Sequence, residues 1–280
     1  MTNGSLITDA TNNWCEGCGN FAILHSIKRI VEELEAGGVR REEIVLVAGI
    51  GCHGKIADYL NINSVYSLHG RAIAFATGIK IAKPELKVIC CVGDGDSYAE
   101  GLEHLIFAAK RNVDITVVVH DNRVYGLTTG QYTPTSPGDY HGKTNPPGGH
   151  DLPFNPPALM LCSGATFIAR AYTGRMDNLR ELIKAGISHC GFSFVEVLQI
   201  CASFFDKSSF YDSHVYEYSG DPKDLSQARE AASEWNYNNE SQIPLGVIYE
   251  TERDCFEERF GYDTSDDELR RRAVMEYLGM

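Results

Sequence analysis

The chain has 280 residues, of which 43% are hydrophobic and 22% are charged, so it is long enough to bury a large globular core. Its formal net charge of −13 argues against nucleic-acid binding, because phosphates require a basic surface. The apolar runs are too short to span a membrane. The first residues do not show the basic region followed by an apolar region that is typical of a signal peptide. We therefore expect a cytoplasmic protein that binds neither nucleic acid nor membrane.

Helices and strands are predicted in regular alternation. Apolar residues at helical spacing predict the helices, and continuous apolar runs bounded by glycine or polar residues predict buried strands. In chain order the predicted elements are a helix at Cys18–Glu35, a strand at Ile44–Ile50, a helix at Arg71–Ala82, a strand at Lys87–Val92, a helix at Ser97–Arg111, strands at Val113–His120 and Thr166–Ala171, a helix at Met176–Cys190 and a strand at Phe194–Ile200. This alternation predicts an α/β fold, a parallel sheet with helices on both faces.

Residues 1–280 are expected to form a single domain, because no internal repeat or linker interrupts the alternation. A segment rich in Thr, Pro and Gly, around 128–157, is too long for a simple connection, so we expect a lid there or an arm that contacts another subunit. A C-terminal extension begins at about residue 205. Ligands of parallel sheets bind beyond the carboxyl ends of the strands, and this is where polar clusters occur in the chain.

One such cluster, Gly93-Asp94-Gly95-Asp96, follows a predicted strand and leads into a helix. The glycines let backbone amides approach an anion, and a helix start favours phosphate. A carboxylate in this turn repels a phosphate unless a cation lies between them. Asp94 therefore indicates Mg²⁺, which prefers oxygen ligands. Asn122, at the end of the next strand, and the carbonyl of Val124 can supply further oxygens.

The whole pattern, strand, Gly-Asp-Gly, helix, strand and Asn, looks like the thiamine diphosphate fingerprint. The rival interpretation is a dinucleotide-binding turn with the spacing Gly-x-Gly-x-x-Gly. Tyr98 stands where that motif requires its third glycine, and Asp94 inside the turn would repel an uncompensated pyrophosphate. We therefore reject the dinucleotide interpretation.

The nine cysteines are not expected to form a disulfide framework in a cytoplasmic chain. Four of them lie in apolar stretches and are expected to be small core residues, namely Cys90, Cys91, Cys162 and Cys190.

Four other cysteines lie among glycines and polar residues or at predicted strand ends. Cys15 and Cys18 form a Cys-x-x-Cys pair, which alone fits a zinc half-site, a redox pair or an iron–sulfur half-site. Cys52 lies in the glycine-bounded turn after the first strand, and Cys201 ends the last predicted strand, although a core role for Cys201 stays open. Together the four thiolates fit zinc or a [4Fe–4S] cluster equally well by ligand type. A cluster is favoured because it would accept electrons beside thiamine.

Several motifs follow one another along the chain, and in this order they resemble the β subunit of 2-oxoacid:ferredoxin oxidoreductases. They are Trp14-Cys-Glu-Gly-Cys-Gly-Asn20, Gly49-Ile-Gly-Cys52, Leu68-His-Gly-Arg-Ala-Ile-Ala-Phe-Ala-Thr-Gly-Ile-Lys80, Gly93-Asp-Gly-Asp96, Asn122-Arg-Val-Tyr-Gly-Leu-Thr-Thr-Gly-Gln131 and Ile243-Pro-Leu-Gly-Val-Ile-Tyr249. The resemblance implies the thiamine diphosphate-binding fold. It also implies CoA-dependent oxidative decarboxylation of a 2-oxo acid, with electrons passing through a [4Fe–4S] cluster to ferredoxin.

The resemblance also implies roles for individual residues. It assigns the cluster to Cys15, Cys18, Cys52 and Cys201, and magnesium to Asp94, Asn122 and the Val124 carbonyl. It assigns cofactor binding to Ile50, Gly51, Cys52, His53, His69, Gly70, Arg71, Gly93, Asp94, Gly95, Asp96, Asn122, Val124, Gly126, Leu127 and Thr128. Leu127 would wedge the cofactor into its bent form.

Lys55 and His53 are the candidate catalytic residues of this chain. By resemblance, Lys55 would meet the second carboxylate of a substrate such as 2-oxoglutarate, with pyruvate as the other candidate. The glutamate that activates thiamine is expected on a partner α subunit, because no second α/β unit is visible here. The chain alone is then expected to be inactive. Two alternatives are a non-redox thiamine-dependent 2-oxo acid decarboxylase subunit and a protein that binds these cofactors for sensing.

Overall fold

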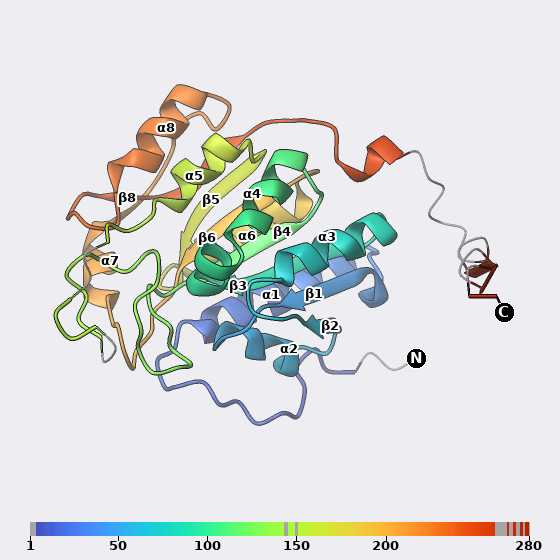
Figure 1. Ribbon diagram of the computed structural model, residues 1–280, viewed down its shortest axis with the longest axis horizontal. Coiled ribbons are helices and arrows are strands. Elements are labelled where there is room, and N and C mark those ends of the chain that lie inside the picture. The colour runs from blue at the N-terminus through green and yellow to red at the C-terminus, as the bar shows by residue number, and fades with distance from the viewer. Residues whose placement is uncertain are drawn as a thin grey trace.

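The computed structural model describes residues 4–142, 145–148 and 151–260, and beyond these 268, 271–272, 275–276 and 278–279 (Figure 1). An eight-stranded sheet with the order β2-β1-β3-β4-β6-β5-β8-β7 runs through it. β5 and β8 pair antiparallel, whereas every other neighbouring pair is parallel. The strands are β1 (Ile44–Ala48), β2 (Asn63–Tyr66), β3 (Lys87–Gly93), β4 (Thr116–Asp121), β5 (Phe167–Tyr172), β6 (Ser193–Leu198), β7 (Val215–Glu217) and β8 (Ile243–Glu250).

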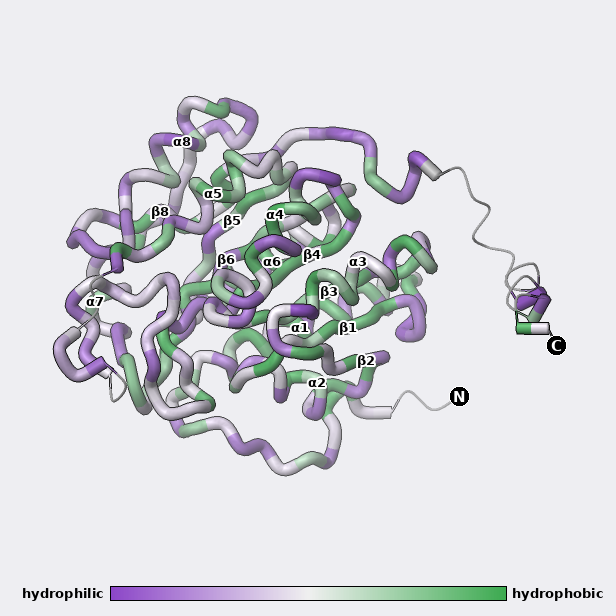
Figure 2. Tube along the Cα trace, in the orientation of Figure 1, coloured by the Kyte–Doolittle hydropathy of each residue, from purple (hydrophilic) through white to green (hydrophobic). Residues whose placement is uncertain are grey.

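Helices cover both faces of the sheet, so the central strands are buried along almost their whole length. α1 and α6 pack on one face, and α3, α4, α5 and α8 pack on the other. Figure 2 shows the hydrophobic residues concentrated along the strands between these layers. The helices are α1 (Asn20–Ala36), α2 (Ile56–Tyr59), α3 (Ala72–Ala82), α4 (Leu102–Arg111), α5 (Pro156–Ser163), α6 (Met176–Ser188), α7 (Ser208–His214) and α8 (Leu225–Glu234).

The predicted α/β fold is confirmed, and the five predicted strands correspond to β1, β3, β4, β5 and β6 with small shifts of their ends. The helix predicted from Ser97 differs, because a π-helical turn at Asp96–Glu100 precedes α4. Three strands were not predicted. β2 is exposed along most of its length, β7 has three residues, and β8 contains Pro244, which disfavours a strand interior.

The predicted long loop has its counterpart between β4 and α5. Its described residues form isolated bridges but no helix or strand. It ends at Asn155, whose side-chain oxygen accepts a hydrogen bond from the Ala158 amide at 3.2 Å and caps α5. The residues expected to form a C-terminal extension include β7 and β8, which join the same sheet.

The prediction of four core cysteines was half wrong. Cys90 and Cys91 are fully buried on neighbouring positions of β3 and point to opposite faces of the sheet. Cys162 and Cys190 are exposed. Cys162 follows buried Met160 by two residues on α5, a spacing that places the two side chains on different sides of a helix. Cys190 lies in the turn between α6 and β6.

No helix in the described part of the chain is long and apolar enough to cross a membrane.

Candidate cofactor and cluster site

The carboxyl ends of four neighbouring strands meet at one edge of the sheet. β1, β3, β4 and β6 are adjacent in the sheet order and run in the same direction. The chain beyond β6 also reaches the start of α1, where the Gly19 amide donates to the Ile200 carbonyl at 2.9 Å. Every predicted ligand segment therefore arrives at this edge.

A pocket of about 70 Å³ lies at this edge. It is lined by Ile50, Gly51, Cys52, His53, His69, Gly93, Asp94, Gly95, Asp96, Asn122, Val124, Tyr125, Gly126, Leu127 and Thr128. Of the residues predicted to bind the cofactor, only Gly70 and Arg71 are missing from this lining. These two residues form hydrogen bonds next to the pocket instead. The Gly70 amide donates a hydrogen bond to Asp96 Oδ1 at 2.7 Å, and Arg71 Nη1 donates to the Glu100 carbonyl at 2.8 Å.

Close approach of backbone to side chain explains two of the glycines. A Cβ atom on Gly49 would lie 1.8 Å from Asp96 Oδ2, and one on Gly95 would lie 2.2 Å from Tyr125 Cε1. Neither position has room for a larger residue while its neighbours stay in place.

Asp96 is buried, and two histidines that line the same pocket lie close to it. His53 Nε2 lies 3.9 Å from Asp96 Oδ2, and His69 Nδ1 lies 3.5 Å from Asp96 Oδ1. Burial lowers the pKa of His53 to about 3, so its ring is neutral and the contact with Asp96 is not an ion pair. His53 Nε2 and Asp96 Oδ2 are buried atoms that have no hydrogen-bond partner among the described residues. Buried polar atoms of this kind point to a missing ligand.

Asp94 is buried beside a second carboxylate, that of Asp121. The Thr135 hydroxyl lies 2.7 Å from Asp121 Oδ1 and 3.2 Å from Asp94 Oδ2, so it bridges the two groups. Burial raises the pKa of Asp94 to about 6. Burial and the charge of Asp94 raise the pKa of Asp121 as well. Asn122 Oδ1 accepts from the Val124 amide at 3.0 Å, which folds the neighbouring segment into a tight turn.

The residue between Asn122 and Val124 is Arg123, which is buried in the left-handed conformation with φ 62°. Its Nε donates to the Thr135 carbonyl at 2.7 Å, and its Nη2 donates to the Tyr237 carbonyl. The guanidinium therefore ties the turn after β4 to the long loop and to the residues before β8.

The four predicted cluster cysteines surround one cavity of about 250 Å³. Its lining includes Cys15, Cys18, Cys52 and Cys201. A Cβ atom on Gly126 would lie 3.6 Å from both Cys52 Sγ and Cys201 Sγ, so these two thiols flank the same glycine.

Hydrogen bonds hold the cysteine segments together. Trp14 Nε1 donates to the Cys52 carbonyl at 2.7 Å, and Gln199 Nε2 donates to Cys18 Sγ at 3.5 Å. Burial, together with the neighbouring thiols of Cys52, Cys201 and Cys15, raises the pKa of Cys18 to about 11. Only a bound cation would make several thiolates favourable in this place.

The cysteine cavity and the Asp94 pocket are adjacent, because Cys52, Asn122, Gly126 and Leu127 line both. Lys55, the predicted substrate-binding residue, lines the cysteine cavity only. Leu127, predicted to shape the cofactor, is 49% exposed between the two.

Sequence reasoning missed Tyr125, Arg123 and Thr135. Tyr125 and Arg123 lie inside the Asn122–Gln131 motif, so their position in the motif was an available signal. No signal in the sequence indicated Thr135, because its position depends on the path of the long loop.

Comparison with known proteins gives two matching family models. The model described as "Thiamine pyrophosphate enzyme, C-terminal TPP binding domain" matches residues 49–197. A model of the C-terminal part of the pyruvate ferredoxin oxidoreductase beta subunit matches residues 201–263. Together they cover the Asp94 pocket, Cys52, Cys201 and the strands that follow, whereas Cys15 and Cys18 precede both matched ranges.

Three similar proteins are informative. The 2-oxoacid:ferredoxin oxidoreductase 1, subunit beta, of Aeropyrum pernix is 40% identical over 271 residues, which cover 91% of this chain and 83% of that one. The 2-oxoglutarate synthase subunit KorB of Archaeoglobus fulgidus is 45% identical over 188 residues, which cover 67% of this chain and 69% of that one. The solved 2-oxoglutarate:ferredoxin oxidoreductase from Magnetococcus marinus, with 2-oxoglutarate, coenzyme A and succinyl-CoA bound, superposes with a TM-score of 0.86 at 34% identity and covers 98% of this chain and 97% of that one. The chain therefore belongs to the β subunits of the 2-oxoacid:ferredoxin oxidoreductases, a family of thiamine pyrophosphate-binding enzymes.

Proposed function

We propose that this chain, together with an α subunit, carries out CoA-dependent oxidative decarboxylation of a 2-oxo acid and passes the electrons through a [4Fe–4S] cluster to ferredoxin. The observation that carries the proposal is that Cys52 lines both the Asp94 pocket and the four-cysteine cavity. An electron donor in the pocket and an acceptor in the cavity would then be neighbours. The ligands bound to the Magnetococcus marinus enzyme support the same class of reaction.

The residues of the pocket fit a metal–diphosphate group. Asp94 is a buried carboxylate without a cation partner among the described residues. Its pKa is raised because burial removes water from the charged form and no cation among these residues compensates for that loss. Asn122 and the Val124 carbonyl would complete an oxygen ligand set of the kind that Mg²⁺ prefers. When bound, thiamine diphosphate supplies the electron sink for decarboxylation.

The cysteine cavity fits a cluster by ligand type and by charge. Burial and the neighbouring thiols raise the pKa values of Cys18 and Cys52, so a bound cation would be needed to hold these two groups as thiolates. Zinc satisfies the same ligands but transfers no electrons, so family membership favours the cluster. It also weighs against the non-redox decarboxylase alternative.

A partner subunit is needed to complete the site. The pocket of about 70 Å³ is small, and we infer that part of the cofactor would be held by the partner subunit. In this arrangement the partner supplies the glutamate that activates the cofactor, and the isolated chain is inactive.

His53 would act in its neutral form. Because its pKa lies far below 7, its unpartnered Nε2 can accept or donate a hydrogen bond in the pocket without carrying a charge. Asp96, 3.9 Å from that nitrogen, would orient the ring.

Lys55 would set the substrate class by pairing with a second carboxylate of 2-oxoglutarate. Its side chain lines the cysteine cavity beside Cys52 and Leu127, close to the proposed cofactor. We expect Lys55→Ala to lower kcat/KM for 2-oxoglutarate by on the order of tenfold to a hundredfold, the worth of one charge-assisted contact, while changing that for pyruvate little. An unchanged ratio of the two values would remove Lys55 from this role.

The reaction is tested with the chain and its α subunit purified together under anaerobic conditions. We expect reduction of ferredoxin that requires a 2-oxo acid, CoA and thiamine diphosphate together, and none from the isolated chain. Acceptor reduction that is independent of CoA, or decarboxylation with no acceptor reduction, would contradict the proposed function.

A further inference from the structure

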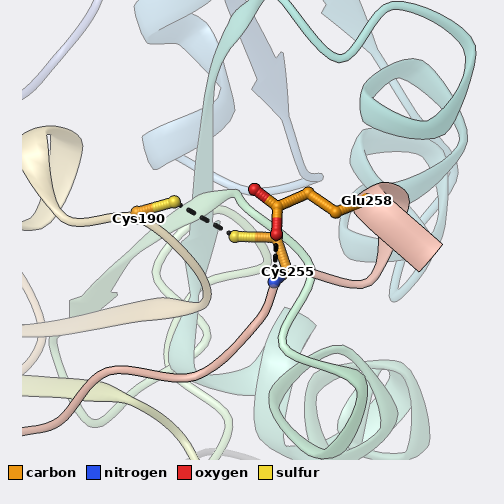
Figure 3. A group of neighbouring side chains, drawn as sticks. All are labelled: Cys190, Cys255 and Glu258. Carbon is orange, nitrogen blue, oxygen red and sulfur yellow. Dashed lines mark hydrogen bonds between the residues drawn. The ribbon is translucent and has the colours of Figure 1, made fainter. Parts of the chain in front are cut away.

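Three potential metal ligands lie close together near the amino ends of the strands, at the opposite end of the sheet from the cofactor site. Cys190 lies in the turn between α6 and β6, and Cys255 and Glu258 lie in the segment that follows β8 (Figure 3). Cys190 Sγ and Cys255 Sγ are 3.2 Å apart, and one carboxylate oxygen of Glu258 lies within 4.8 Å of both sulfurs. Glu258 Oε2 also accepts a hydrogen bond from the Cys255 amide at 3.3 Å, so this segment already folds around the group.

This group is separate from the cofactor site. The turn that carries Cys190 precedes β6 and therefore lies at the amino end of that strand, whereas the cofactor pocket lies at the carboxyl ends. The segment after β8 is fixed there by Asn112, which precedes β4. Asn112 Nδ2 donates to the Arg253 carbonyl at 2.8 Å, and the Phe256 amide donates to the Asn112 carbonyl at 3.1 Å.

We propose that Cys190, Cys255 and Glu258 bind a thiophilic divalent cation, of which zinc is the type, and that the cation clamps the segment after β8 to the sheet. Cysteine sulfur and carboxylate oxygen are both zinc ligands, so the group supplies three of four tetrahedral positions and water is available for the fourth. Two sulfurs bound to zinc at about 2.3 Å in a tetrahedron are about 3.8 Å apart, whereas a disulfide requires about 2.05 Å. The separation of 3.2 Å is nearer to the zinc geometry.

The charges around the group favour a cation. The carboxylates of Asp114 and Glu257 act electrostatically on Cys255. Lys80 Nζ offsets part of this negative charge, because it lies 2.6 Å from Asp114 Oδ2. The negative charge that remains attracts a divalent cation.

The test uses the full chain with its iron loaded, equilibrated anaerobically with buffered Zn²⁺ and then dialysed. Zinc and iron are measured together in wild type, Cys190→Ser and Glu258→Gln, with Cys162→Ser as the matched loss of an exposed thiol elsewhere. We expect one more zinc per chain in wild type and Cys162→Ser than in Cys190→Ser, and weaker zinc retention in Glu258→Gln. Zinc should also raise the unfolding temperature of wild type but not that of Cys190→Ser.

Equal zinc content in wild type and Cys190→Ser would overturn the proposal. So would a Cys190–Cys255 disulfide in the wild type, identified by peptide mass mapping without reductant as a linked peptide that separates on reduction. Unchanged iron in every variant would show that the four-cysteine cavity is intact, so the outcome is independent of the proposed function.

Discussion

Replacing Asp94 with asparagine should stabilise the empty chain while abolishing its metal–diphosphate site. Burial raises the pKa of Asp94 from 3.8 to about 6. Because the folded state holds this proton more tightly than the unfolded state, the contribution of Asp94 to stability is most favourable below about pH 4 and falls as the pH rises from about 4 to about 6. At 1.36 kcal/mol for each pKa unit, the ionised carboxylate destabilises the empty chain by about 2–3 kcal/mol at neutral pH.

Asparagine keeps the shape and removes that charge. In the absence of Mg²⁺ and thiamine diphosphate, Asp94→Asn should therefore unfold at a temperature roughly 5–10 °C above wild type, as scanning calorimetry would measure. Adding both ligands should stabilise wild type strongly and the variant little, which reverses or closes the gap. Asp177→Asn, at a carboxylate whose side chain is 96% exposed, should change neither measurement. The reasoning is refuted if Asp94→Asn is no more stable than wild type when empty, or if the ligands stabilise both equally.

Two further predictions concern a close backbone contact and a buried ion pair. Gly49→Ala places a Cβ atom 1.8 Å from Asp96 Oδ2. We therefore expect a titration to show at least a roughly tenfold loss of affinity for thiamine diphosphate. Gly78→Ala is the control and should bind thiamine diphosphate normally, because no atom lies within 4 Å of its new Cβ. Arg170→Met leaves the buried Glu196 without the partner that now lies 2.7 Å away, so urea unfolding should show a loss of about 3–5 kcal/mol, and a loss under about 1 kcal/mol would contradict the importance of this pair.

The central sheet was predictable from the sequence because its strands are continuous apolar runs, as parallel strands buried on both faces must be. The outer strands were not. β2 has no buried face to produce a pattern, and β8 carries Pro244 next to its first residue. The local pattern was also insufficient at Cys162, since apolar neighbours do not reveal which side of a helix a residue occupies.

The candidate site was predictable where chain order and topology coincide. Motifs at the ends of neighbouring parallel strands must converge, so the residues around Cys52, Asp94 and Asn122 were expected together, and the structure brings them together. Thr135 could not be assigned in this way, because its position depends on the path of the long loop. Arg123 lies within the Asn122–Gln131 motif, but the motif does not reveal its contact with the Tyr237 carbonyl, which is far away along the chain.

The most direct test of the account is the iron content of the chain when Cys52 is replaced by alanine. Cys52 is the residue shared by the cofactor pocket and the cysteine cavity. For chain purified anaerobically with its α subunit, we predict about four irons per chain in wild type and in Cys162→Ser. In Cys52→Ala we predict little iron and no visible cluster absorbance. Wild-type iron in Cys52→Ala would contradict the claim that Cys52 joins the cofactor pocket to an iron–sulfur cluster.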